Sequence, residues 1–151
     1  MIRAFRIPLL WLSVVLLLGS SRFGAHQTGP WLIPLLKALA PWAAARDLDG
    51  LHMVVRKLWH LTQYAILART WLLGVLAWRR SSLRTASWIA LLVCVACAFV
   101  DEGHQAMLLT RTGSAADAVL DSLGALMMLM MLRARYEASA PAPAAAAEPG
   151  G

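Results

Sequence analysis

The sequence predicts an all-α integral membrane protein: a bundle of four transmembrane helices with a helical outer loop at the membrane interface. Composition is the first reason. Of the 151 residues, 60% are hydrophobic and only 15% are charged, whereas an ordinary soluble domain is about 25% charged. The second reason is that the mean hydropathy is +0.62 and the apolar residues gather in stretches. A bilayer-spanning helix needs roughly 20 such residues, so the chain has room for four.

Four apolar stretches mark the predicted spans. The first covers about residues 4–21 and resembles a signal peptide, with a basic start and an apolar centre. Because no Ala-x-Ala cleavage site follows it, we predict that it is retained. The other spans cover about residues 58–78, 86–100 and 115–132. The transmembrane domain then occupies residues 1–135, and the Ala/Pro/Gly-rich tail, residues 136–151, is predicted to be disordered.

The connection between the first two spans, residues 22–57, is the longest in the chain. Its apolar part, residues 31–45, is interrupted by a lysine and a proline, which makes it a poor span. We therefore predict a short interfacial helix with its tryptophans at headgroup level. Asp47 or Asp49 is predicted to cap the helix that follows.

Arginine clusters predict the orientation of the spans. Basic residues in short loops favour the cytoplasmic side of a membrane. Three clusters flank alternate ends of the spans and agree with one another: Arg3 and Arg6; Arg79, Arg80 and Arg84; Arg133 and Arg135. Both termini are then predicted to be cytoplasmic.

With this orientation, polar side chains of three spans gather at the outer leaflet. Ionisable groups at membrane depth usually face a protein interior or a water-filled cavity. We therefore predict one shared site, although a purely structural network is the alternative. Helical spacing defines three faces: Lys57, His60 and Tyr64; Asp101, His104 and Gln105; and Asp117, Asp121 and Gly124. Glu102 adds a further carboxylate beside the second face. The small Gly124 allows another helix to approach closely.

These residues resemble the signature of VanZ-like membrane proteins. The resemblance covers roughly residues 10–132 and implies a bacterial inner-membrane protein with several spans. The name-giving member of that family is associated with low-level resistance to the glycopeptide teicoplanin. The matching elements are Lys57-x-x-His60-x-x-x-Tyr64, Asp101-Glu102-x-His104-Gln105, and Arg111 followed by Asp117 and Gly124.

Three functions are compatible with the predicted site. The favoured one is binding of a lipid-linked envelope component or a glycopeptide such as teicoplanin, with Lys57 and Arg111 holding a phosphate or carboxylate. The second is a hydrolase or transferase acting on phospho-linked lipids, because the histidines and carboxylates suit a divalent metal or acid–base chemistry. The third is a structural partner of an envelope complex. No resident cofactor is predicted, and no nucleotide or nucleic-acid motif is present.

Three polar or sulfur-containing features lie inside the spans. Cys94 and Cys97 are interpreted as small apolar residues of a membrane helix, and the methionines at 127–131 as packing or lipid-facing side chains. Arg69 lies near the middle of the second span. It snorkels towards the interface, pairs with a carboxylate, or indicates that the span boundaries are shifted.

Overall fold

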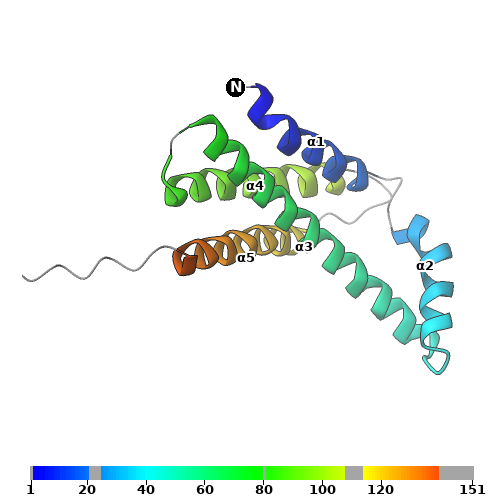
Figure 1. Ribbon diagram of the computed structural model, residues 1–151. Helices are drawn as coiled ribbons and strands as arrows, with labels where there is room; N and C mark the ends of the chain where they lie inside the picture. Colours follow the sequence, from blue (N-terminus) through cyan, green and yellow to red (C-terminus); the bar gives the residue numbers. More distant parts are fainter. Residues whose placement is uncertain (1, 21–24, 80, 108–113, 140–151) are drawn as a thin grey trace, which may run out of the picture.

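Helices make up almost all of the part of the chain that the computed structural model describes, residues 2–20, 25–79, 81–107 and 114–139 (Figure 1). No strand occurs among these residues, so the predicted all-α class is confirmed. The described helices are α1 (Ile2–Leu18), α2 (Ala25–Leu39), α3 (Ala45–Trp78), α4 (Leu83–Ala106) and α5 (Ala115–Ser139).

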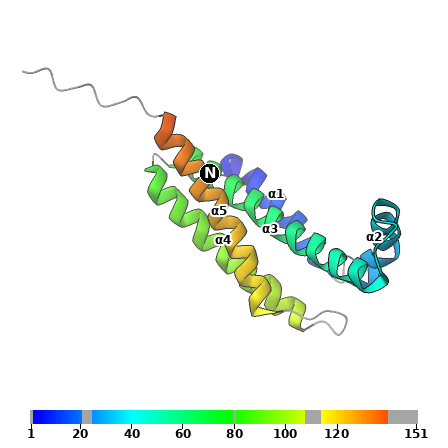
Figure 2. The same cartoon turned by 90° about the horizontal axis from the view of Figure 1, so that it is seen from below.

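The long helix α3 is the axis of the molecule, because each of the other helices packs against it. Its C-terminal half lies among α1, α4 and α5, and α2 packs beside its first turns (Figures 1 and 2). Its 34 residues give it a length of about 51 Å, well beyond the roughly 30 Å of a bilayer's hydrocarbon core. The first part of α3 and α2 therefore project past one end of the other helices.

Two helices, α4 and α5, are long and apolar enough to cross a membrane by length and composition. Only 28% of the residues in the most apolar part of each are buried, so most of their apolar surface faces outward. By the same criteria α1 and α3 do not qualify. With 17 residues, α1 is short, and the apolar part of α3 is interrupted by polar residues, among them His60, Gln63 and Arg69. Two of the four predicted spans therefore meet these criteria.

The helix ends differ from the predicted limits of the spans. The helix α3 begins at Ala45 instead of near residue 58, and α5 continues to Ser139, so residues 136–139 of the predicted tail are helical. Hydropathy locates the apolar part of a helix, but backbone hydrogen bonding continues through charged residues that are good helix formers. A helix was predicted over residues 31–45, and the structure has a helix that lies earlier, α2. Residues 140–151 lie outside the described part.

The residue predicted to cap the N-terminus of α3 was wrong. Neither Asp47 nor Asp49 is the N-cap, which is the extended residue Ala44. Asp47 instead lies in the first turn, where its carboxylate accepts a hydrogen bond from the Ala44 N–H at 3.3 Å. A negative charge at this end also interacts favourably with the helix dipole, so Asp47 still helps to start the helix.

Three side chains dock α2 on the first part of α3. The Thr28 hydroxyl lies 3.0 Å from a ring nitrogen of His52, and the Arg56 guanidinium donates to the same hydroxyl at 3.2 Å. His52 is buried, and burial lowers the pKa of its imidazole below 6.5; the Arg56 charge acts in the same direction and Asp49 opposes it. The imidazole is therefore neutral at pH 7.

Acidification is expected to loosen α2 from α3. Because the pKa of His52 is lower in the folded state, its contribution to stability is present above about pH 6.5 and is lost as the pH falls. Hydrogen-exchange protection factors of α2 amides, measured in detergent at neutral and at acidic pH, should fall several-fold on acidification. The variant His52→Gln should abolish that difference, and an unchanged difference in the variant would contradict the assignment.

The helices α3 and α5 approach each other closely at Gly124 of α5. A Cβ atom added there would collide with the Leu61 carbonyl oxygen of α3 and would lie 3.0 Å from the carbonyl carbon. Glycine lets the two backbones approach because it has no side chain. Gly103 of α4 differs, since nothing lies within 4 Å of such a Cβ atom.

The substitution Gly124→Ala is expected to destabilise the fold by roughly 1–3 kcal/mol, because the added methyl group overpacks the α3–α5 interface. Gly103→Ala is the matched control and should be neutral, or stabilising by up to about 1 kcal/mol through helix propensity. Unfolding of both variants in detergent, followed by circular dichroism, measures the difference. Equal stabilities would show that the close approach is unimportant.

Candidate functional site

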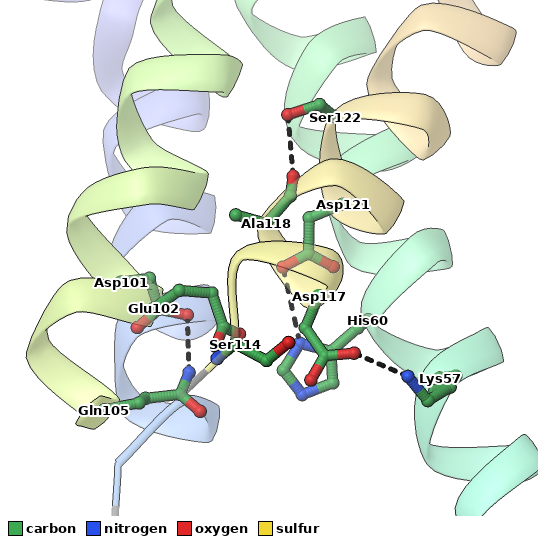
Figure 3. Close-up of polar contacts among 10 residues, drawn as sticks. All are labelled: Lys57, His60, Asp101, Glu102, Gln105, Ser114, Asp117, Ala118, Asp121 and Ser122. Carbon is green, nitrogen blue, oxygen red and sulfur yellow. Dashed lines mark hydrogen bonds and ion pairs between the residues drawn. The ribbon is translucent and has the colours of Figure 1, made fainter. Parts of the chain in front are cut away.

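Polar side chains from three helices meet where α4 ends and α5 begins, beside the middle of α3 (Figure 3). Each helix contributes part of the group, which we call the polar cluster: Lys57 and His60 from α3; Asp101, Glu102 and Gln105 from α4; Asp117 and Asp121 from α5. Each of these residues belongs to the site predicted from the sequence, and all but Glu102 were predicted from helical spacing.

The outer edge of the polar cluster is an ion pair between α3 and α5. The Lys57 ammonium lies 2.6 Å from a carboxylate oxygen of Asp117, and the two side chains are 50% and 33% exposed. Ion pairs with this exposure contribute only about 0–1 kcal/mol to stability. The pair can therefore open to admit another charged group at little cost in stability.

The interior of the polar cluster holds His60, Glu102 and Asp121. His60 Nδ1 lies 3.6 Å from Asp121 Oδ2, a separation too long for a hydrogen bond. The Asp121 side chain is 0% exposed, and neither of its oxygens has a hydrogen-bond partner among the described residues. Glu102 is buried and accepts a hydrogen bond from the Ser114 backbone N–H at 2.9 Å. Two buried carboxylates thus lie beside one imidazole.

Asp101 faces α1. Its carboxylate accepts a hydrogen bond from the Gln105 amide at 3.0 Å, and both side chains are buried. A Cβ atom added at Gly19, just after α1, would lie 2.7 Å from one of the Asp101 carboxylate oxygens. Gly19 therefore makes room for Asp101, a role that the sequence did not reveal because it depends on where the end of α1 lies relative to α4.

The structure does not bring every predicted residue into the polar cluster. His104 is exposed on α4, because at about 100° per residue it falls outside the arc that buries Asp101, Glu102 and Gln105. Tyr64 is buried on α3, one turn beyond His60, and lies close enough to Asp101 and Asp121 to interact with their charges, but its hydroxyl has no hydrogen-bond partner among the described residues. Arg111 lies outside the described residues.

A pocket of about 280 Å³ adjoins the polar cluster between the end of α1, α2 and α3. His60 belongs to both, so the pocket and the cluster share a wall. The sequence did not reveal this pocket, because its walls come from three helices whose docking is not encoded in residue spacing. Its lining is mostly apolar: Leu18, Trp31, Leu32, Val55 and Trp59, with Thr28, Arg56 and His60 as the polar members.

Comparison with known protein families supports the resemblance to VanZ-like proteins that the site residues suggested. The sequence profile of the VanZ/LLP1 family matches residues 7–136. The chain belongs to the VanZ/LLP1 family. This match includes the whole polar cluster and the pocket, and it confirms the predicted relationship to VanZ-like proteins. Neither the curated proteins nor the solved structures contain a match to the chain.

The ion pair between Lys57 and Asp117 at the edge of this VanZ/LLP1 site is expected to contribute little to the stability of the fold. Lys57→Ala and Asp117→Ala should each change the free energy of unfolding by at most about 1 kcal/mol, because the pair is half-exposed. A double-mutant cycle in detergent should give a coupling energy in the same range. A coupling of several kcal/mol would contradict the description of the pair as an open edge.

Proposed function

We propose that the protein binds a lipid-like molecule at the outer leaflet of a bacterial inner membrane. The polar head of the molecule occupies the polar cluster, and part of its apolar chain enters the adjoining pocket. The observation that carries the proposal is the position of His60, which lines the apolar pocket and also lies in the charged cluster. Such a junction matches a molecule with one apolar and one charged part.

The proposed membrane arrangement has α1, the C-terminal part of α3, α4 and α5 as four spans. Two features support it. The starts of α1 and α4 and the ends of α3 and α5 lie at the bundle end opposite the polar cluster (Figures 1 and 2), and basic residues gather towards that end, which makes it cytoplasmic. Apolar side chains also remain exposed along these helices, among them Leu10, Leu73, Trp88, Leu92, Met127 and Met130.

Both termini are then cytoplasmic, and the polar cluster lies at the outer leaflet. The projecting part of α3, together with α2, lies beyond the hydrocarbon core on that side. Arg69 is exposed on α3, and its long side chain snorkels towards the interface.

The basic side chains at the exposed edge of the site favour an anionic head group there. Lys57 is half-exposed at the edge and its partner Asp117 is partly exposed, while Arg56 lines the pocket. Ammonium and guanidinium groups bind phosphates and carboxylates through charge-assisted hydrogen bonds. Pockets for whole drug-sized molecules measure roughly 300–1,000 Å³, so a pocket of about 280 Å³ suits a segment of an alkyl chain. A lipid-linked envelope precursor and the apolar tail of a glycopeptide such as teicoplanin both meet this description.

Cysteine labelling tests the orientation. In a variant with Cys94→Ala and Cys97→Ala, a cysteine at Gly103 should react with a membrane-impermeant maleimide in spheroplasts. A cysteine at Glu137 should react only after the membrane is permeabilised. The reverse pattern, or equal labelling of both positions, would rule out the proposed topology.

Binding tests the ligand class. The substitution Val55→Trp fills the pocket and should weaken binding of a polyprenyl phosphate, or of teicoplanin, by tenfold or more, equivalent to about 1.4 kcal/mol. Val54→Trp places the same side chain on the neighbouring residue, which is 51% exposed and outside the pocket, and should bind normally. Binding is measured with the full chain in detergent by a tryptophan-independent method, such as thermophoresis of a labelled ligand. The proposal fails if neither ligand binds saturably, or if both variants lose binding equally.

The interior of the polar cluster favours one alternative, an enzyme acting on phospho-linked lipids. His60, Glu102 and Asp121 lie close enough together to hold a metal ion or to transfer protons. Turnover of a polyprenyl diphosphate by the purified protein, abolished by His60→Ala and retained by His104→Ala, would favour this alternative over simple binding.

A further inference from the structure

Asp121 is the most unusual polar side chain of the described structure. It is 0% exposed, and both carboxylate oxygens lack a hydrogen-bond partner among the described residues. The His60 imidazole lies 3.6 Å from one of these oxygens, close enough for an ion pair but not for a hydrogen bond. Burying a carboxylate without hydrogen bonds costs several kcal/mol. A carboxylate oxygen also has two lone pairs that can be donated. The position therefore calls for a partner that accepts electron pairs, such as a cation.

Two further electron-pair donors face the same space. His60 approaches Asp121 from α3, and Glu102 approaches from α4 (Figure 3). One donor atom from each of the three residues lies within 4.8 Å of the others. Glu102 accepts one hydrogen bond, from the Ser114 backbone, which orients its carboxylate and leaves lone pairs for another partner.

The charges of the neighbouring side chains also favour a bound cation. Glu102 and Asp121 carry two carboxylates when ionised, and His60 supplies at most one positive charge. The nearby Lys57 ammonium is engaged by Asp117 at 2.6 Å, on the exposed edge of the polar cluster. A divalent cation between these three residues would neutralise both carboxylates while His60 stays neutral and donates its nitrogen lone pair.

We propose that His60, Glu102 and Asp121 bind one divalent transition-metal ion, either Zn²⁺ or Mn²⁺. One imidazole with two carboxylates suits these ions better than Mg²⁺ or Ca²⁺, which prefer oxygen ligands alone. Donor atoms of a tetrahedral zinc site lie about 3.4 Å apart, so side-chain rotations that bring the donor atoms closer by up to about 1.4 Å, from a separation of at most 4.8 Å, close the site. Three protein ligands leave at least one coordination position for water or a phosphate oxygen, as in sites where the metal contacts a substrate.

Elemental analysis of the full chain tests the proposal without any lipid ligand. Tag-free protein in detergent is stripped with a chelator, dialysed against Zn²⁺ or Mn²⁺, and freed of excess ion. Wild-type protein should retain about one ion per chain, as expected of a single site, and its thermal unfolding temperature should rise with ion concentration. Asp121→Asn and Glu102→Gln should lower the retained ion at least tenfold. The controls Asp49→Asn and His104→Ala change exposed residues of the same types and should retain it.

A second experiment, in which a variant gains an absorption band, keeps the test decisive if the variants that lose metal binding fail to fold. In the Cys94→Ala, Cys97→Ala background, His60→Cys supplies a thiolate ligand, and added Co²⁺ should produce a thiolate-to-cobalt charge-transfer absorption. His104→Cys should not produce this band. The proposal is overturned if wild-type protein retains no more ion than the loss variants, or if monodisperse His60→Cys protein lacks the band. A proton instead of a metal would then neutralise the buried carboxylates. Because no lipid is present, this result is independent of the proposed ligand binding.

Discussion

The contact between Gly124 of α5 and the Leu61 carbonyl of α3 is the constraint on which the site depends. Gly124 follows Asp121 by three residues, about one helical turn, and Leu61 directly follows His60. This close backbone approach therefore lies beside His60 and Asp121, two residues of the interior of the polar cluster. A larger residue at Gly124 would separate the helices and move Asp121 away from His60.

Buried polar side chains gather in the polar cluster. Burying them costs free energy, and a purely structural role explains that cost poorly. Polar contacts between membrane helices contribute only about 0.6–2 kcal/mol each, whereas a buried carboxylate without partners costs several kcal/mol. Asp121 makes no hydrogen bond among the described residues, and the His60 imidazole that faces it lies 3.6 Å away. A fold selected only for stability would gain more from an apolar residue at that position. A ligand or ion that interacts with the carboxylate accounts for it better than helix association does.

Helical periodicity predicted much of the candidate site, because the positions of residues one turn apart depend only on local geometry. Lys57 and His60, and Asp117 and Asp121, share faces as the spacing indicated. The same argument failed for His104, which is exposed on α4. Its neighbours Asp101, Glu102 and Gln105 are buried instead, because the orientation of α4 is decided by the helices that pack against it. Spacing also could not locate the ends of α3 and α5, where charged residues continue the helix.

The sequence by itself determined the helical class, the apolar character of the chain, the family relationship and the residues that carry the polar chemistry. These properties depend on composition and on spacing within single helices. Only the tertiary structure decided that Asp101 lies against Gly19, that Asp121 has no hydrogen-bond partner among the described residues, and that His60 joins the polar cluster to an apolar pocket. Each of these depends on the distance and rotation between helices far apart in the chain. Side-chain packing sets that distance and rotation, and residue spacing within one helix does not specify them.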